Sequence, residues 1–199
     1  MEAEKVERKR DIVIKNRKLL DRLIEGNRQF LSAQAPSGNV SPARRLETAE
    51  NGQQPDAIVI ACSDSRVMPE SIFSAGLGEL FVIRVAGNVL DDHQLGSIEY
   101  AAGHLHTKLI IVLGHTGCGA VDAALSGGGD GFIKYITDEI LLAVGTETDP
   151  DRACFLNVLH AVETIRREFA AHPEIPSDEL DIIGAVYDIS SGAVHWLAD

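Results

Sequence analysis

Three short runs of β-branched and other apolar residues constrain the fold of this chain more than any other feature of its sequence. They lie at residues 57–62, 80–85 and 108–113, and apolar residues do not alternate with polar ones in them. Runs of this length without alternation are typical of strands covered on both faces. Helix-like segments separate or follow them, at residues 69–75, 94–105 and 152–171. Strands alternating with helices predict an α/β fold built around a parallel sheet.

Two more strands are predicted near the end of the chain. They span residues 181–188 and 193–197, and the sequence Ser190-Ser191-Gly192 between them is a turn signal. Strands joined by so short a turn run antiparallel. The predicted fold is therefore a mixed, mostly parallel central sheet flanked by helices.

The amino-terminal segment has a different pattern. Residues 4–33 are rich in charge and carry an apolar stripe at helical spacing, and Pro36 and Gly38 interrupt it. We expect an N-terminal helical arm over residues 1–40, lying across the main body or a partner subunit. The sequence has no internal repeat and no low-complexity linker, so we expect a single domain over residues 1–199, with residues 55–199 as its catalytic α/β core.

Charge and cysteine content narrow the possible partners and compartment. The chain has 30 acidic and 18 basic residues and a net charge of −12, which disfavours binding to nucleic acid. Its apolar runs are far shorter than the roughly 20 residues of a membrane-spanning helix, so we expect no membrane association. The charged first residues resemble no export signal, and the number of cysteines is odd. We therefore expect a cytoplasmic protein in a reducing compartment.

Candidate metal ligands follow two of the predicted strands. Cys62 ends the first run, while His115 and Cys118 follow the third. The carboxyl ends of neighbouring parallel strands meet at one edge of a sheet, which is where ligands bind in such folds. If these two strands are neighbours, two thiolates and one imidazole converge there. That set suits Zn²⁺ and leaves a fourth position for water or a carboxylate.

Alternative interpretations exist for each of these residues. One buried cysteine is more often a small hydrophobic residue than a ligand, and we interpret Cys154, on the predicted helix 152–171, as a core residue. Two cysteines and a histidine together favour a metal. Asp64 could close the metal shell as a fourth ligand, which would make the site structural. Pairing with Arg66 would instead hold Asp64 off the metal and leave an exchangeable, catalytic position.

Several sequence blocks together resemble β-class carbonic anhydrases. The resemblance covers about residues 20–198, and its most specific parts are Cys-Ser-Asp-Ser-Arg at 62–66 and Gly-His-Thr-Gly-Cys-Gly at 114–119. Further matching blocks lie at residues 52–55, 81–88, 98–101 and 184–188. The resemblance implies a zinc enzyme that reversibly hydrates carbon dioxide to bicarbonate and a proton.

The resemblance also implies a role for each matching residue. Cys62, His115 and Cys118 match the zinc ligands. Asp64 and Arg66 match a catalytic dyad, in which Asp64 either occupies the fourth metal position or pairs with Arg66 and hydrogen-bonds the solvent ligand. The implied substrate-binding residues are Gln53, Phe81, Tyr100 and Gly119.

Assembly and regulation are further implications of the resemblance. The family implies a homodimer, or a dimer of dimers, whose active sites lie at the subunit interface and whose N-terminal helices embrace the partner. Members gated by bicarbonate carry a tryptophan where this chain has Val59, although Arg84 and Tyr187 match the rest of that site. We therefore expect no bicarbonate gating and an open site at neutral pH.

Two other functions stay open from the sequence. The same nucleophile could hydrolyse carbonyl sulfide or carbon disulfide, which a paired assay with carbon dioxide would reveal. A non-enzymatic, zinc-stabilised interaction protein is the third possibility. Zinc without exchangeable water would favour it.

The ligand set generates a prediction about pH. Two thiolates cancel the formal charge of a zinc ion, so such a site acidifies water less than three neutral imidazoles do. Hydration activity should therefore climb above neutral pH. Stopped-flow rates between about pH 6 and about pH 9 check this, and a flat profile over that range would contradict it.

Overall fold

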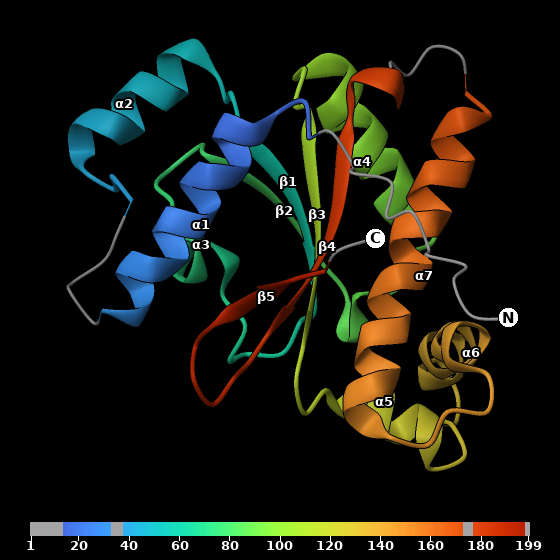
Figure 1. Cartoon of the computed structure of the whole chain (residues 1–199). Coiled ribbons are helices and arrows are strands. Elements are labelled where there is room, and N and C mark those ends of the chain that lie inside the picture. Colours follow the sequence, from blue (N-terminus) through green and yellow to red (C-terminus); the bar gives the residue numbers. More distant parts are fainter. Residues whose placement is uncertain (1–13, 33–37, 173–176, 198–199) are drawn as a thin grey trace, which may run out of the picture.

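The computed structural model describes residues 14–32, 38–172 and 177–197 and contains one five-stranded sheet (Figure 1). The strand order is β2-β1-β3-β4-β5, and the first three pairings are parallel while β4 and β5 are antiparallel. This confirms the predicted mixed, mostly parallel sheet. The strands are β1 (Ala57–Ala61), β2 (Leu80–Arg84), β3 (Leu109–His115), β4 (Asp181–Tyr187) and β5 (Val194–Trp196).

Helices cover both faces of this sheet, as the absence of polar alternation in β1 and β3 requires. Figure 1 shows α1 and α3 on one side of the strands and α4 and α7 on the other. Every residue of β1 and β3 is buried. Successive side chains of a strand point to opposite faces, so β1 and β3 each contribute residues to two separate apolar clusters, one on each face of the sheet. The helices are α1 (Arg17–Leu31), α2 (Pro42–Asn51), α3 (Pro69–Ile72), α4 (Asp92–His104), α5 (Gly119–Leu125), α6 (Ile133–Val144) and α7 (Pro150–Ala170), with short 3₁₀ helices η1 (Ala86–Asn88) and η2 (Ser177–Glu179).

Helix α1 packs on the sheet of its own chain. Its Leu20 and Leu23 are buried in the apolar cluster that includes Val59 and Ile111 of the strands. The Asp181 carboxylate fixes the start of the helix, because it accepts hydrogen bonds from the backbone N–H groups of residues 15 and 16 at 3.2 and 2.6 Å. Of the two positions expected for the arm, the described part therefore lies on the main body. Residues 4–13 of the predicted helix lie outside the described residues.

Three helices of the structure were not predicted from the sequence, and a fourth is shorter than predicted. Helix α2 buries no residue, so it has no apolar stripe to reveal it, although Ser41 accepts a capping hydrogen bond from Arg44 N and Pro42 follows. Helices α5 and α6, which were not predicted either, lie on the two sides of the glycine-rich segment 127–131. The predicted helix at 69–75 stops at residue 72, since Ser74 adopts a left-handed conformation with φ of +48°.

A buried asparagine on α1 generates a stability prediction. The Asn27 amide donates to the carbonyls of Ile72 and Gly192 at 3.3 and 3.0 Å, and its oxygen accepts from Val194 N at 3.1 Å. Asn27→Leu leaves these three backbone groups unpaired and should lower the free energy of unfolding by about 1–3 kcal/mol. Urea denaturation measures this. The exposed neighbour Arg28 is the control, because Arg28→Ala should change stability by no more than about 0.5 kcal/mol. Equal losses in the two variants would contradict the role of Asn27.

Candidate metal centre

The pairing of β1 with β3 brings the predicted metal ligands together. Ala61 lies opposite Leu113 in the parallel register, so Cys62 and His115 emerge at the same edge of the sheet. Cys118 follows three residues after His115 and immediately precedes α5. The ligand atoms of Cys62, His115 and Cys118 all lie within 4.8 Å of one another, and all three residues are buried. The predicted convergence of these side chains is confirmed.

The hydrogen bonds of His115 leave one ring nitrogen free to bind a metal. Its Nδ1 lies 3.0 Å from the Thr116 carbonyl oxygen, which can only accept, so Nδ1 carries the proton. Its Nε2 is buried and finds no hydrogen-bond partner within the described chain. An unpaired buried nitrogen costs free energy. A histidine that donates one N–H to a carbonyl and turns the other nitrogen inward has the arrangement of a metal ligand.

The two cysteines form an anionic pair. A hydrogen bond from Cys118 holds the pKa of Cys62 well below its usual range against the effect of burial, and His115 lowers it further. The same contact with Cys62, together with burial, raises the pKa of Cys118. Burial lowers the pKa of His115, but the Cys62 sulfur offsets this and the net change is a rise. The pair therefore favours a single negative charge, which Cys62 carries and the hydrogen bond from Cys118 stabilises.

The donor set fits zinc. Thiolates and a neutral imidazole suit Zn²⁺, whereas Mg²⁺ and Ca²⁺ prefer oxygen ligands. Among the described residues, the three side chains of Cys62, His115 and Cys118 form the group that could hold one metal ion. Three protein ligands leave a fourth position for an exchangeable ligand, as catalytic zinc sites do.

Asp64 is held away from the three ligands by Arg66. The Arg66 guanidinium donates to both carboxylate oxygens of Asp64, through Nε at 2.9 Å and Nη2 at 2.7 Å, and the Arg66 backbone N–H adds a third bond at 2.9 Å. This pairing holds the pKa of Asp64 well below its usual range, so the carboxylate is ionised. Arg66 Nη2 also donates to the Gly117 carbonyl at 3.3 Å. Of the two arrangements expected for Asp64, the structure has the one paired with Arg66.

Arg84 supports the site through contacts that were not predicted from the sequence. It ends β2 and donates to two carbonyls of the loop after β1, from Nε to Cys62 O at 3.0 Å and from Nη2 to Asp64 O at 2.7 Å. The loop that carries Cys62 and Asp64 is therefore clamped to β2. The sequence does contain a hint of this role, because Arg84 lies near the end of the predicted strand 80–85, which is the first strand after Cys62.

Three of the predicted substrate-binding residues lie at the opposite end of the sheet. Phe81 pairs with Ile58, four residues before Cys62, which places its Cα roughly 13 Å from that of Cys62. Tyr100 lies against Phe81, with ring centroids 6.3 Å apart, and Gln53 precedes β1. Within one chain, these three side chains do not approach the metal ligands. The fourth, Gly119, does lie beside them, since it follows Cys118 directly and begins α5.

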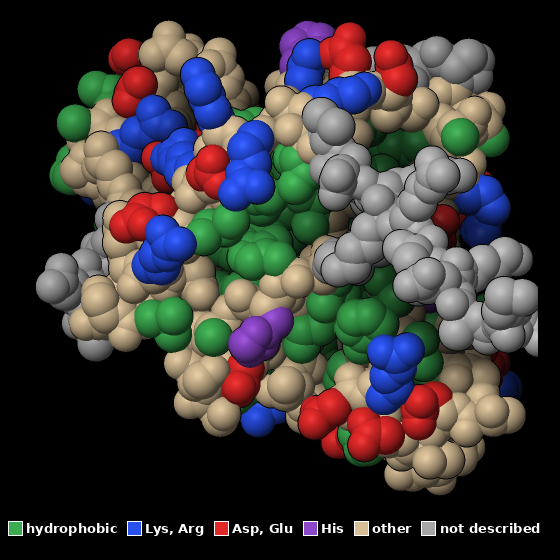
Figure 2. All heavy atoms as spheres, viewed as in Figure 1, with side chains coloured by type: hydrophobic (Ala, Val, Ile, Leu, Met, Phe, Trp, Pro, Cys, Tyr) green, Lys and Arg blue, Asp and Glu red, His purple; other side chains and the backbone are tan. Residues whose placement is uncertain are grey.

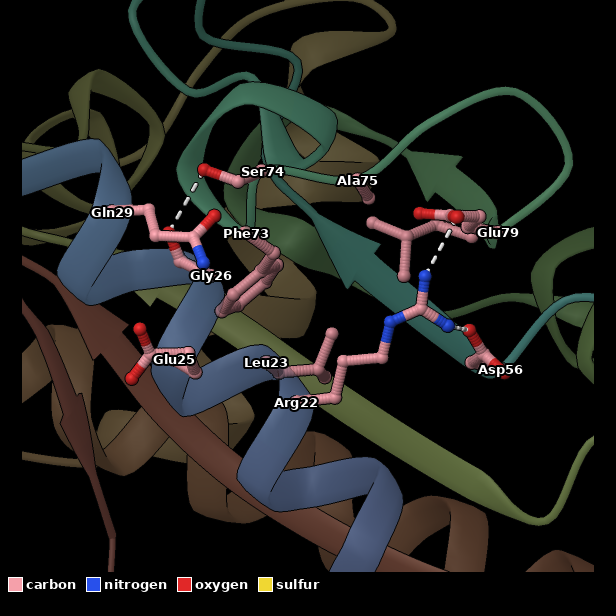
Figure 3. A pocket seen from close by; sticks show the side chains of 11 residues that line it. Arg22, Leu23, Glu25, Gly26, Gln29, Asp56, Phe73, Ser74, Ala75 and Glu79 are labelled. Carbon is pink, nitrogen blue, oxygen red and sulfur yellow. Dashed lines mark hydrogen bonds and ion pairs between the residues drawn. The ribbon is translucent and has the colours of Figure 1, made fainter. Parts of the chain in front are cut away.

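A pocket in the described structure also lies away from the metal ligands (Figure 3). It lies between α1 and the segment that links α3 to β2. Arg22 pairs there with Asp56 and, at 2.6 Å, with Glu79, and Ser74 Oγ donates to Gly26 O at 2.9 Å. Its lining has one cation, Arg22, and three carboxylates, those of Glu25, Asp56 and Glu79. Asp56 and Glu79 directly precede β1 and β2, so within one chain the pocket lies at the end of the sheet opposite the three candidate ligands.

Among the helices of the described residues, we find none with the length and apolar character that a bilayer span requires.

Comparison with known proteins agrees with these features. Residues 57–194 match the model of a family described as "Carbonic anhydrase". Carbonic anhydrase 2 of Mycobacterium tuberculosis is 37% identical over 181 residues, which cover 85% of this chain and 87% of that protein. A carbonic anhydrase of Mycolicibacterium smegmatis is 35% identical, over 87% of this chain and 89% of its own length.

Solved structures show the same fold. The β-carbonic anhydrase CafA of Aspergillus fumigatus superposes with a TM-score of 0.66 at 27% identity, covering 78% of this chain and 81% of that one. A β-carbonic anhydrase of Sordaria macrospora, described as tetrameric, gives a TM-score of 0.64 at 26% identity and covers 79% of this chain and 92% of that one.

The third cysteine of the chain provides a matched control for the ligand assignment. Cys154 is buried in the same apolar cluster as Cys62 and Cys118, and burial raises the pKa of its thiol to about 11. Cys118→Ser should weaken metal binding by more than the roughly 10- to 100-fold that loss of an outer partner costs. Cys154→Ser should retain the metal. Metal analysis after dialysis against a chelator compares the two, and equal metal content would contradict the assignment.

Proposed function

This chain belongs to the β-class carbonic anhydrase family, and from that premise we propose that it hydrates carbon dioxide with a zinc ion held by Cys62, His115 and Cys118. Hydration of carbon dioxide is the general activity of the family. The observation that carries the zinc assignment is the buried, unpartnered Nε2 of His115 facing two cysteine sulfurs.

The three ligands prepare a position for water. A bound zinc ion supplies a Lewis acid that makes water nucleophilic nearer to neutral pH. The carbonyl of Thr116 fixes the tautomer of His115 and the orientation of its ring. Burial of all three ligands excludes competing solvent from their donor atoms.

Asp64 and Arg66 orient the attacking water in the proposed mechanism. Arg66 keeps the Asp64 carboxylate ionised, and an ionised carboxylate only accepts hydrogen bonds. A water that donates to Asp64 turns a lone pair toward the carbon of carbon dioxide. The water oxygen bonds to that carbon, the product is bicarbonate, and one proton leaves to buffer. The bond from Arg66 to Gly117 ties the dyad to the loop between His115 and Cys118.

Recognition of carbon dioxide needs little from the protein, because the molecule is small and uncharged. We assign Phe81 and Tyr100 to the walls of an apolar pocket, Gln53 to an amide donor and Gly119 to a backbone contact. The first three lie at the amino end of the sheet within one chain, so this assignment requires them to come from a partner subunit.

The proposed assembly is therefore a homodimer or a dimer of dimers. Association that places the amino end of one sheet near the carboxyl end of another would complete two sites at once. Hydrophobic side chains gather in the middle of one face of the molecule, beside α1, where a second chain could cover them (Figure 2). The tetrameric relative from Sordaria macrospora is consistent with this assembly.

The proposed compartment is the cytoplasm. All three cysteines of the chain are free and buried, which suits a reducing environment.

The function is tested by stopped-flow hydration of carbon dioxide with zinc analysis and light scattering on the same sample. We expect hydration, about one zinc per chain and a mass of at least two chains. Parallel assays with carbonyl sulfide and carbon disulfide test the alternative substrates. Turnover of those molecules without hydration would overturn the proposal, and so would a zinc-loaded protein that hydrates nothing.

The dyad yields a more specific prediction. Arg66→Ala removes both side-chain bonds to Asp64, which frees the carboxylate to turn toward the metal ligands. Turnover should fall by about 100-fold or more while zinc stays bound, because the water loses its orienting group. Arg17→Ala, which breaks the exposed ion pair with Asp21 on α1, is the control and should keep full activity. Retained activity in Arg66→Ala would refute the role of the dyad.

A further inference from the structure

A buried pair of hydrogen bonds runs from helix α7 to the sulfur of Cys62. Asn157 of α7 is buried, and its Nδ2 donates to the Gly87 carbonyl at 2.8 Å. The N–H of Gly87 in turn donates to Cys62 Sγ at 3.2 Å. Asn157 lies 70 residues from Gly87 in the sequence and is assigned no part in the mechanism above. These two bonds connect helix α7, which packs on one face of the sheet, to the sulfur of a proposed metal ligand.

The backbone at Gly87 is held in an unusual conformation. Gly87 has φ of +69°, and Asn88 follows with φ of +45°, so two successive residues of η1 are left-handed. A Cβ on Gly87 would lie 2.8 Å from Ile140 Cδ1 and 3.1 Å from Ala120 Cβ. Both the positive φ and the close side chains disfavour a larger residue at this position. Glycine adopts this conformation without strain, so the direction of the Gly87 N–H depends on the contacts that hold the segment.

The sulfur of Cys62 accepts hydrogen bonds from two backbone N–H groups, and different parts of the structure hold these two groups in place. One is the N–H of Asp64 at 3.4 Å, in the loop that Arg84 clamps to β2. The other is the N–H of Gly87, whose carbonyl is held by Asn157. The second donor thus depends on α7, while the first does not.

We propose that Asn157 is a positioning residue for the metal centre, which keeps the Gly87 N–H aimed at the Cys62 sulfur by holding the Gly87 carbonyl. This inference rests on the proposed function of Cys62 as a metal ligand. An N–H bond to a thiolate withdraws electron density from the sulfur and fixes its direction, so it tunes the metal that the sulfur binds. Removing that bond changes the donor strength of Cys62, which shifts the spectrum of the bound metal. It also leaves the sulfur less well oriented, and this loss of orientation weakens metal binding.

A purely structural role for Asn157 predicts something different. A buried amide needs hydrogen-bond partners wherever it lies, so its loss destabilises the fold in any case. Asn27 is a matched example, because it is also a buried asparagine that donates to backbone carbonyls. It lies on α1, however, and its partners Ile72 and Gly192 are not among the candidate metal ligands. The two asparagines therefore separate loss of stability from perturbation of the metal centre.

The test uses the full chain with Co²⁺ in place of zinc, in the wild type and in the variants Asn157→Leu, Asn157→Asp and Asn27→Leu. Asn157→Asp keeps the shape of the side chain but loses its N–H donors at neutral pH. In both Asn157 variants, the cobalt–thiolate absorption band should shift and the cobalt dissociation constant should rise by about 10-fold or more. Asn27→Leu should lose stability and keep the wild-type band and affinity.

Wild-type band position and affinity in the Asn157 variants would overturn the inference, and so would an equal shift in Asn27→Leu. A measurement on the unaltered protein covers the case in which the Asn157 variants do not fold. With ¹¹³Cd bound, the Gly87 amide proton should show scalar coupling to the metal through the sulfur. Absence of that coupling would also overturn the inference. None of these readouts needs turnover, so a protein that binds cobalt but does not hydrate carbon dioxide would refute the proposed function alone.

Discussion

The parallel pairing of β1 with β3 is the interaction on which the rest of the structure depends. The register that places Ala61 opposite Leu113 delivers Cys62 and His115 to one edge of the sheet from positions more than fifty residues apart. Both strands are wholly buried, so helices on both faces fix their depth and direction. The candidate metal ligands therefore lie at or directly after the ends of buried strands, and only short connections separate them from the core.

The two ends of the sheet divide the chemistry between them. The carboxyl end holds the soft donors and the Asp64–Arg66 pair, while Phe81 and Tyr100 lie together at the amino end. Parallel strands impose this separation, because a residue near the start of β2 cannot lie beside a residue that follows β1. In the proposed assembly, one chain therefore supplies the candidate metal ligands of a pocket and the other chain supplies its aromatic walls.

Sequence patterns anticipated the strands and the ligands because those features are local. Strands without polar alternation, and the reactive residues after them, can be seen in windows of a few residues. Helix α2 escaped because it buries nothing, and the contact between Asn157 and Gly87 escaped because it joins positions 70 residues apart. The place of Phe81 relative to Cys62 also needed the register of β1 and β2, which composition and spacing do not contain.

Helix α1 covers the sheet of its own chain, anchored by Asp181 at its start and by Asn27 further along. This face of the sheet is therefore covered without a partner subunit. If the active site is shared between chains, dilution would separate the subunits and abolish catalysis, while each subunit would stay folded. Loss of catalysis at low concentration would be reversible and would recover as the chains find one another again.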